Sequence, residues 1–196
     1  MKTLFKKGLL TVLALSFLVG TASAAEYAID ASHSTLGFAV KHLQVGTTRG
    51  VFADYSGTIS FDPADYSTFK ADATIQVSSI DTNNEKRDGH LKSGDFFEAE
   101  TYPTITFAST RLEKSGEGDV IVGNLTIKGI TKEISIPVSV VGPVEGMGGG
   151  MVVGIAGETT INRQDFGVSW SKTLDGGGLV VGDEVKLTIE IEAHAK

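Results

Sequence analysis

The sequence predicts an all-β protein: an eight-stranded antiparallel up-and-down barrel with a short helix between strands three and four. From Ser34 onward apolar and polar residues alternate, which places one set of side chains on each face of a strand. Turn residues separate these segments, and most connections are short enough to pair sequence neighbours antiparallel. Closure into a barrel hides both sheet edges and the apolar face. A two-sheet sandwich would also bury that face, and periodicity alone does not distinguish the two.

The last strand has the clearest alternation, because apolar residues from Val185 to Ile191 are separated by charged or hydroxyl residues. The other seven predicted strands are centred on Leu36 to Val40, Ile59 to Phe61, Phe69 to Val77, Ile105 to Phe107, Ile121 to Ile127, Ile134 to Val140 and Met151 to Ile155. Turns are predicted at Gly46, Asp62-Pro63, Gly116 to Gly118, Gly129, Gly142-Pro143, Gly146 to Gly150 and Gly176 to Gly178.

The alternation stops between the third and fourth predicted strands. Thr82-Asn83-Asn84-Glu85 has the capping-box pattern of a helix start, so a short helix is expected from there to about Lys92. An insertion of this kind at a barrel mouth can act as a lid. Asp81 is expected to end the third strand, and Tyr102-Pro103 to align the entry to the fourth.

Residues 1–24 are expected to be a cleavable secretory signal peptide. Three lysines precede an apolar run from Leu9 to Val19, and Ala22-Ser23-Ala24 is a small-residue cleavage site. The run is shorter than the roughly 20 residues that cross a bilayer, so no stable membrane insertion is expected. Cleavage after Ala24 would leave one exported domain, residues 25–196.

The composition of that domain excludes several classes of function. Without the three lysines of the signal, 14 basic residues face 24 acidic ones, a net charge of −10. Such a surface repels phosphate groups, so no nucleic acid and no anionic membrane surface is expected as a partner. The chain has no cysteine, which excludes disulfides, a thiolate nucleophile and thiolate metal ligands.

Motifs for catalysis, metals and cofactors are also missing. His33, His42 and His90 have neither an i, i+4 spacing nor a His-Glu-x-x-His pattern, so no metal site is expected. No Gly-x-Ser-x-Gly nucleophile turn is present, and Gly148-Gly149-Gly150 precedes a strand rather than a helix, so it cannot hold a phosphate at a helix terminus. We therefore expect no catalytic residues and no cofactor.

Several segments, in the same order, resemble the YceI-like family. They span nearly all of residues 25–196: Ser34 to His42, Asp81, Glu85 to Leu91, Asp95-Phe96-Phe97, Tyr102 to Phe107, Gly123 to Lys132, Thr160 to Gly167 and Val181 to Val185. The resemblance implies a periplasmic, lipocalin-like barrel that holds a polyisoprenoid, an isoprenoid quinone or another long-chain lipid, with a link to stress. It also implies that a homodimer can form.

The alternating apolar residues have two interpretations. They either fill the barrel as an ordinary core or, as the resemblance implies, line a ligand tunnel. The residues of this face are Phe38, Val40, Ile59, Phe61, Ile75, Val77, Ile105, Phe107, Ile136, Val138, Val153, Ile155, Leu187 and Ile189.

Polar residues near the predicted lid are candidates for binding a headgroup. Arg87, His90 and Lys92 could hold an anionic or carbonyl group, and Asp88 could orient one of them. His42 continues the inward register of Leu36, Phe38 and Val40 at the end of its strand. The alternative for all of these residues is a solvated surface.

The segment around Arg163 and Asp165 is expected to be a structural turn that closes the far end of the barrel with Phe166 and Trp170. Together these features predict a binding or carrier protein for transport, storage or sequestration of a lipid. The alternative is an enzyme, or an electron-transfer partner, that acts on a quinone or lipid in the same pocket.

Overall fold

The computed structural model describes residues 24–196 except 117 and 174–176. The expected signal peptide therefore lies, apart from its last residue, outside the described residues.

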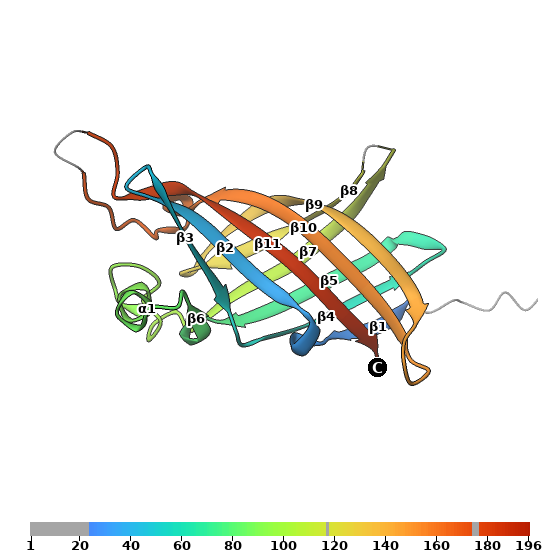
Figure 1. The fold of residues 1–196 in the computed structure, drawn as a ribbon. Coiled ribbons are helices and arrows are strands. Elements are labelled where there is room, and N and C mark those ends of the chain that lie inside the picture. The colour runs from blue at the N-terminus through green and yellow to red at the C-terminus, as the bar shows by residue number, and fades with distance from the viewer. Residues whose placement is uncertain (1–23, 117, 174–176) are drawn as a thin grey trace, which may run out of the picture.

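Eight antiparallel strands close into a barrel, as the sequence predicts (Figure 1). The ring is closed by β1, which pairs with β11 on one side and β4 on the other. The strands of the ring are β1 (Ala25–Ile29), β4 (Tyr55–Asp62), β5 (Asp65–Gln76), β7 (Thr104–Ser115), β8 (Gly118–Ile127), β9 (Ile130–Glu145), β10 (Met151–Asn162) and β11 (Val181–Ala195).

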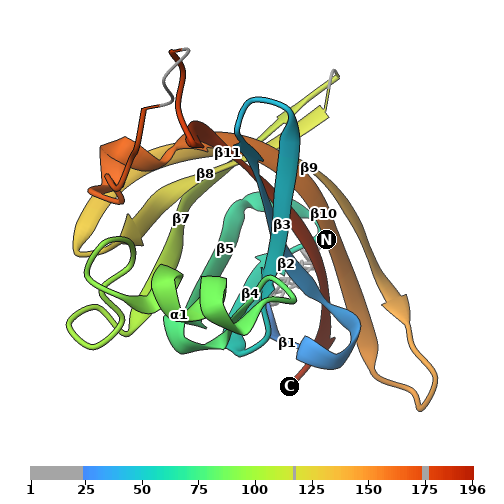
Figure 2. The ribbon, with the colours of Figure 1, turned by 60° about the vertical axis from the view of Figure 1, so that its left-hand side comes forward.

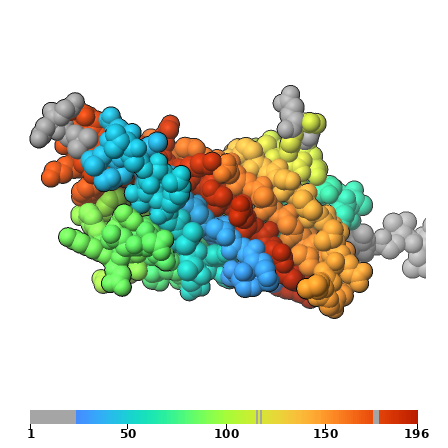
Figure 3. Space-filling model, viewed as in Figure 1, coloured from blue at the N-terminus to red at the C-terminus, as the bar shows by residue number. Residues whose placement is uncertain are grey.

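Three further strands extend the wall: β2 (Thr35–His42), β3 (Gly46–Phe52) and β6 (Ile80–Asp81). β11 is long enough to pair with β1 near its C-terminal end and with β2 from Val181 to Glu190. The β2–β3 hairpin therefore lies along β11, as the space-filling view of the barrel surface shows (Figure 3).

All eight predicted strands form, but the first of them, β2, lies outside the closed ring, and β1, β3 and β6 were not predicted. β1 directly follows the expected cleavage site, and β6 has only two residues. β3 has the sequence GTTRGVF, which contains two glycines and no apolar alternation. Its pairing with β2 at the edge of the sheet, rather than its own pattern, makes it a strand.

The turn predicted at Gly142-Pro143 is wrong, because β9 continues through both residues. The register between β9 and β10 shifts opposite this point, between Val152 and Gly154. Gly142 has a φ of 102°, which favours glycine, and proline is tolerated at such an irregularity because it needs no ladder hydrogen bond.

The lid segment forms helix α1 (Glu85–Lys92), which lies across one end of the barrel (Figure 2). We call this end the mouth. The N-cap is Asn84, whose side chain accepts a hydrogen bond from the Arg87 amide at 3.0 Å. The prediction of Thr82 as the cap is wrong, since Thr82 is buried and bonds to Asp88 instead. The third predicted strand, β5, ends at Gln76 and not at Asp81, which instead ends the short β6 and accepts a hydrogen bond from the Asn83 amide.

The opposite end, which we call the closed end, is packed solid with aromatic side chains. Phe61 is fully buried between Tyr27 and Tyr66, with ring centroids 5.8 and 5.7 Å away, and Phe69 packs beside it. A second apolar cluster, which includes Phe96, Ile105 and Phe166, lies toward the mouth. Three 3-10 turns complete the fold: η1 (Ala31–His33), η2 (Val77–Ser79) and η3 (Arg163–Phe166).

Candidate functional site

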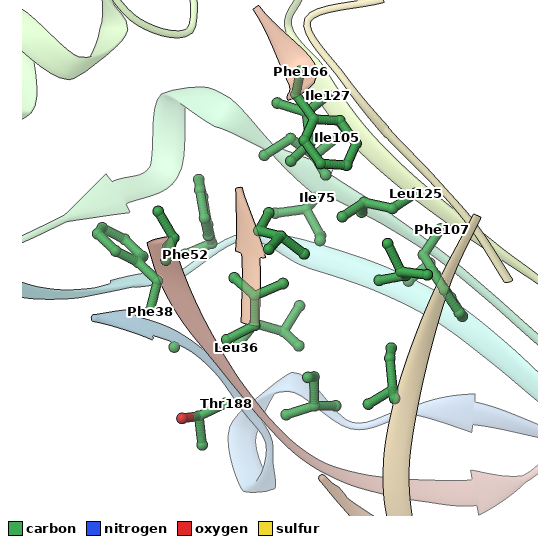
Figure 4. Close-up of a pocket in the computed structure, with 18 of the residues that line it drawn as sticks. Leu36, Phe38, Phe52, Ile75, Ile105, Phe107, Leu125, Ile127, Phe166 and Thr188 are labelled. Atoms are coloured by element: carbon green, nitrogen blue, oxygen red, sulfur yellow. The ribbon is translucent and has the colours of Figure 1, made fainter. Parts of the chain in front are cut away.

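A cavity of about 230 Å³ runs between these two apolar clusters, inside the barrel. Its wall is formed by the inward faces of nearly every strand (Figure 4). The labelled side chains in the figure are hydrocarbon apart from Thr188. An engineered apolar cavity of about 150 Å³ already binds benzene, so this volume is large enough for an apolar guest.

Most of the apolar residues that alternation places inside do line this cavity. They are Phe38, Val40, Ile59, Ile75, Ile105, Phe107, Ile136, Val138, Ile155, Leu187 and Ile189.

Phe61, Val77 and Val153 do not line it, so their assignment to a tunnel wall is corrected. Phe61 and Val153 are completely buried in the packed closed end. Val77 begins η2, where strand periodicity no longer applies, and its amide donates to the Pro103 carbonyl. The strand register therefore determines whether a side chain points into the barrel. Its position along the barrel axis determines whether it lines the cavity or packs in the solid core.

Sequence reasoning missed the residues that cover the cavity at the mouth. Leu91 of α1 and Phe96 and Phe97 after it contribute to the lining, together with Phe52 of β3. Leu91, Phe96 and Phe97 can be recognised in the sequence as the large apolar residues of a segment that is otherwise polar. Periodicity could not find them because they approach the cavity from a helix and a turn.

A smaller cavity of about 180 Å³ lies at the mouth and carries the basic groups. His42, Arg87 and His90 line it, together with Lys41 and Trp170. Phe38, Val40, Leu91, Phe96 and Val181 line both cavities, so the two are neighbours separated by these side chains. The predicted headgroup residues His42, Arg87 and His90 are thus brought together next to the apolar interior.

Asp88 and Lys92 line neither cavity, which corrects their assignment to a headgroup site. Asp88 is buried and accepts hydrogen bonds from the amide and the hydroxyl of Thr82. It therefore anchors the start of α1 rather than orienting His90 or Arg87. Lys92 is the last residue of α1, and its carbonyl accepts from the Ala99 amide.

Arg87 is held by the same anchor. Its Nε donates to the Thr82 hydroxyl and its Nη2 to the Thr82 carbonyl, both at 2.7 Å. These two bonds fix the plane of the guanidinium at the rim of the small cavity. Its Nη1 has no hydrogen-bond acceptor within the described part of the chain, so this nitrogen can donate to a ligand.

His90 belongs to an aromatic group at the mouth. Its ring meets Phe96 and Trp170 edge to face, with centroids 5.0 and 5.3 Å away. Its Nε2 is 2.8 Å from a carboxylate oxygen of Asp95. His42 at the end of β2 is exposed, although its register predicts an inward side chain, and it lines the small cavity at the rim of the barrel.

Arg163 is a structural residue, but its turn lies at the mouth and not at the closed end. Its buried guanidinium donates to the carbonyls of Val168 at 2.6 Å, Trp170 at 2.8 Å and Gly182 at 2.8 Å, and to Asp183 at 3.0 Å. Burial lowers the pKa of this guanidinium. The bonds tie the segment that carries Trp170 to the start of β11. Asp165 is exposed in the same turn.

Comparison with known proteins agrees with this architecture. Residues 27–193 match the model of the YceI-like domain. A UPF0312 protein of Staphylococcus aureus strain MSSA476 is 41% identical over 167 residues, which cover 85% of this chain and 95% of the relative.

Solved structures of similar chains have the same barrel. BcnA of Burkholderia cenocepacia superposes with a TM-score of 0.72 at 28% identity, over 84% of this chain and 98% of BcnA. A YceI protein of Campylobacter jejuni gives 0.68 at 37% identity, over 80% and 90% of the two chains. A polyisoprenoid binding domain from Saccharophagus degradans gives 0.63 at 17% identity, over 87% and 98%, which is a likeness of fold. Among the described residues, the helices are too short or too polar to cross a membrane.

Proposed function

Because this chain belongs to the YceI-like family, we propose that it is a binding protein that holds a long apolar lipid of the polyisoprenoid type inside its barrel. The observation that carries the proposal is the position of the two cavities: an apolar interior directly beside a small cavity lined by His42, Arg87 and His90. An amphiphile fits this arrangement, with its tail in the barrel and its polar head at the mouth.

The energetics favour an apolar chain as the ligand. Each buried methylene contributes roughly 0.8 kcal/mol, so about ten of them give a gross 8 kcal/mol, equivalent to a dissociation constant near 1 μM. Ordering the flexible tail offsets part of this, while a charge-assisted hydrogen bond at the head adds to it. Tight binding with slow release suits transport, storage or sequestration better than turnover.

In this proposal the protein works in the periplasm after removal of residues 1–24, and its ligand is a polyisoprenoid, an isoprenoid quinone or a related lipid. The name of the Saccharophagus degradans domain, which describes polyisoprenoid binding on the same fold, supports this ligand class. The acidic composition supports a carrier that does not adhere to anionic membrane surfaces.

The test is extraction of the natively purified protein with organic solvent and analysis of the extract by mass spectrometry. We expect about one long-chain lipid per barrel. A protein without lipid, to which an added polyprenol also fails to bind, would overturn the proposal. The variant Lys86→Ala is the control for a change of surface charge. It should retain as much lipid as the parent, because Lys86 is exposed on α1 and lines neither cavity.

A further inference from the structure

Four metal-ligating side chains meet on the outer wall of the barrel, at the seam where β1 and β11 close the ring. Asp30 and His33 come from the turn after β1, and Glu192 and His194 from the end of β11. One donor atom from each of Asp30, His33 and Glu192 lies within 4.8 Å of the other two. η1 packs beside the C-terminal end of β11, which brings the two pairs together (Figure 1).

Each of the four donor atoms lies within 4.0 Å of two of the others. The Asp30 Oδ2 atom is 2.8 Å from His33 Nδ1 and 3.6 Å from His194 Nε2. The Glu192 Oε1 atom is 2.9 Å from His194 Nε2 and 4.0 Å from His33 Nδ1. Bonds of about 2.0–2.2 Å to a tetrahedral Zn²⁺ place neighbouring ligand atoms roughly 3.3–3.6 Å apart. The four distances lie on both sides of that value. The donor atoms of Asp30, His33 and Glu192 lie within 4.8 Å of one another, and the His194 ring, which is near Asp30 and Glu192, has to turn toward His33 for all four atoms to reach one ion.

The backbone around these side chains is already fixed. The Asp30 amide donates to the Glu192 carbonyl at 2.9 Å, and the Ser34 hydroxyl bridges both backbone groups of Glu192. The other oxygen of Asp30 accepts from the amide and hydroxyl of Ser32 at 2.8 and 2.6 Å. Such outer hydrogen bonds orient a ligating carboxylate.

The site is also open to solvent and independent of the cavities. The side chains of His33, Glu192 and His194 are 65%, 39% and 48% exposed, so an ion can enter and a water can complete its coordination. Glu192 and His194 point outward, because the alternate residues Ile191 and Ala193 are buried inside the barrel. None of the four lines either cavity.

We propose that Asp30, His33, Glu192 and His194 form a binding site for a late first-row divalent metal ion, with Zn²⁺ as the reference ion. Two imidazoles and two carboxylates match zinc, copper, nickel or cobalt, whereas Ca²⁺ needs six to eight oxygen ligands. Because the ligands come from both sides of the β1–β11 seam, the bound ion would also fasten the closure of the barrel. This inference does not depend on the proposed lipid function.

The test is calorimetric titration of the protein, produced without a polyhistidine tag and stripped with a chelator, with ZnCl₂. We expect saturable binding of one ion per chain and a rise in the unfolding temperature with zinc concentration. Loss of an outer hydrogen-bond partner alone typically weakens metal binding about 10–100-fold, so His33→Ala and His194→Ala should each weaken it by on the order of 100-fold.

Three further measurements make the result decisive. Glu192→Gln keeps the shape of the side chain, so weaker zinc binding by this variant separates ligand loss from misfolding, which circular dichroism checks. His42→Ala removes a histidine at the mouth and should bind zinc as the parent does. CaCl₂ should give no saturable heat. Absence of zinc binding, or equal affinity in the His33→Ala and His194→Ala variants and the parent, would overturn the proposal.

Discussion

Replacing Ala73 with leucine tests whether the interior of the barrel is a cavity or a self-filled core. Ala73 lies on the inward face of β5 and lines the large cavity with Ala71 and Ile75. Leucine adds roughly three methylene equivalents, worth about 2.4 kcal/mol at 0.8 kcal/mol each when they become buried. In an empty cavity these atoms fill space, so the lipid-free protein should gain stability by up to this amount.

The same atoms take the place of ligand carbons. Binding of a long-chain alcohol or fatty acid should therefore weaken by a similar free energy, which corresponds to roughly 50-fold in the dissociation constant. Urea unfolding of delipidated protein measures the first effect, and displacement of a fluorescent fatty acid measures the second. Opposite changes in stability and affinity are the signature of a filled cavity.

A core that is already packed would respond differently. Overpacking destabilises by about 1–3 kcal/mol, and ligand binding elsewhere would be unaffected. A loss of stability with unchanged affinity would therefore refute the reasoning. Ala156→Leu is the matched control, because Ala156 is exposed on the outer face of β10 and should change neither quantity appreciably.

Three other substitutions test the mouth, the anchor and the packing of the wall. Arg87→Ala should weaken binding of an anionic amphiphile about 10–100-fold, because a hydrogen bond to a charged group is worth about 1.5–3 kcal/mol. Binding of an uncharged alkane analogue should not change, and equal losses for both ligands would contradict this prediction. Arg163→Met leaves several carbonyls without donors and should cost about 3 kcal/mol in urea unfolding, whereas a cost under about 1 kcal/mol would count against its structural role. Gly57→Ala places a Cβ 2.2 Å from the Asp72 carbonyl oxygen and should destabilise the protein by about 1–3 kcal/mol. Gly89→Ala has open space around the new Cβ in α1 and should stabilise it by about 0.5–1 kcal/mol. A higher thermal midpoint for Gly57→Ala than for Gly89→Ala would contradict both expectations.

The barrel itself could be predicted because its signal is local. Alternation such as that of Leu187 and Ile189 in β11 reports which face of a strand is apolar, and turn residues report where strands end. Segments that became strands only by pairing with a neighbour carried no such signal, as β3 illustrates. The helix was found from its cap pattern, although Asn84 rather than Thr82 serves as the cap.

The candidate site could be predicted only in part. The sequence predicted His42, Arg87 and His90 as headgroup candidates. They meet at the mouth only because β2 and α1 lie side by side there. Sequence spacing cannot predict that contact, since His42 is more than forty positions from the residues of α1. Asp88 and Lys92 belong to the same helix but line neither cavity, because α1 places only part of its surface at the mouth.

The amino-acid sequence by itself determined the strand pattern, the apolar inner face, the absence of cysteine chemistry and the family. The tertiary structure alone decided where the barrel is hollow and where it is packed, and so separated Ile59 from Phe61 on one strand. It also brought His33 beside Glu192, and Asp30 beside His194, across the barrel seam. The physical reason is that periodicity depends on neighbours along the chain, whereas cavities and ligand clusters depend on how distant strands close around a common axis.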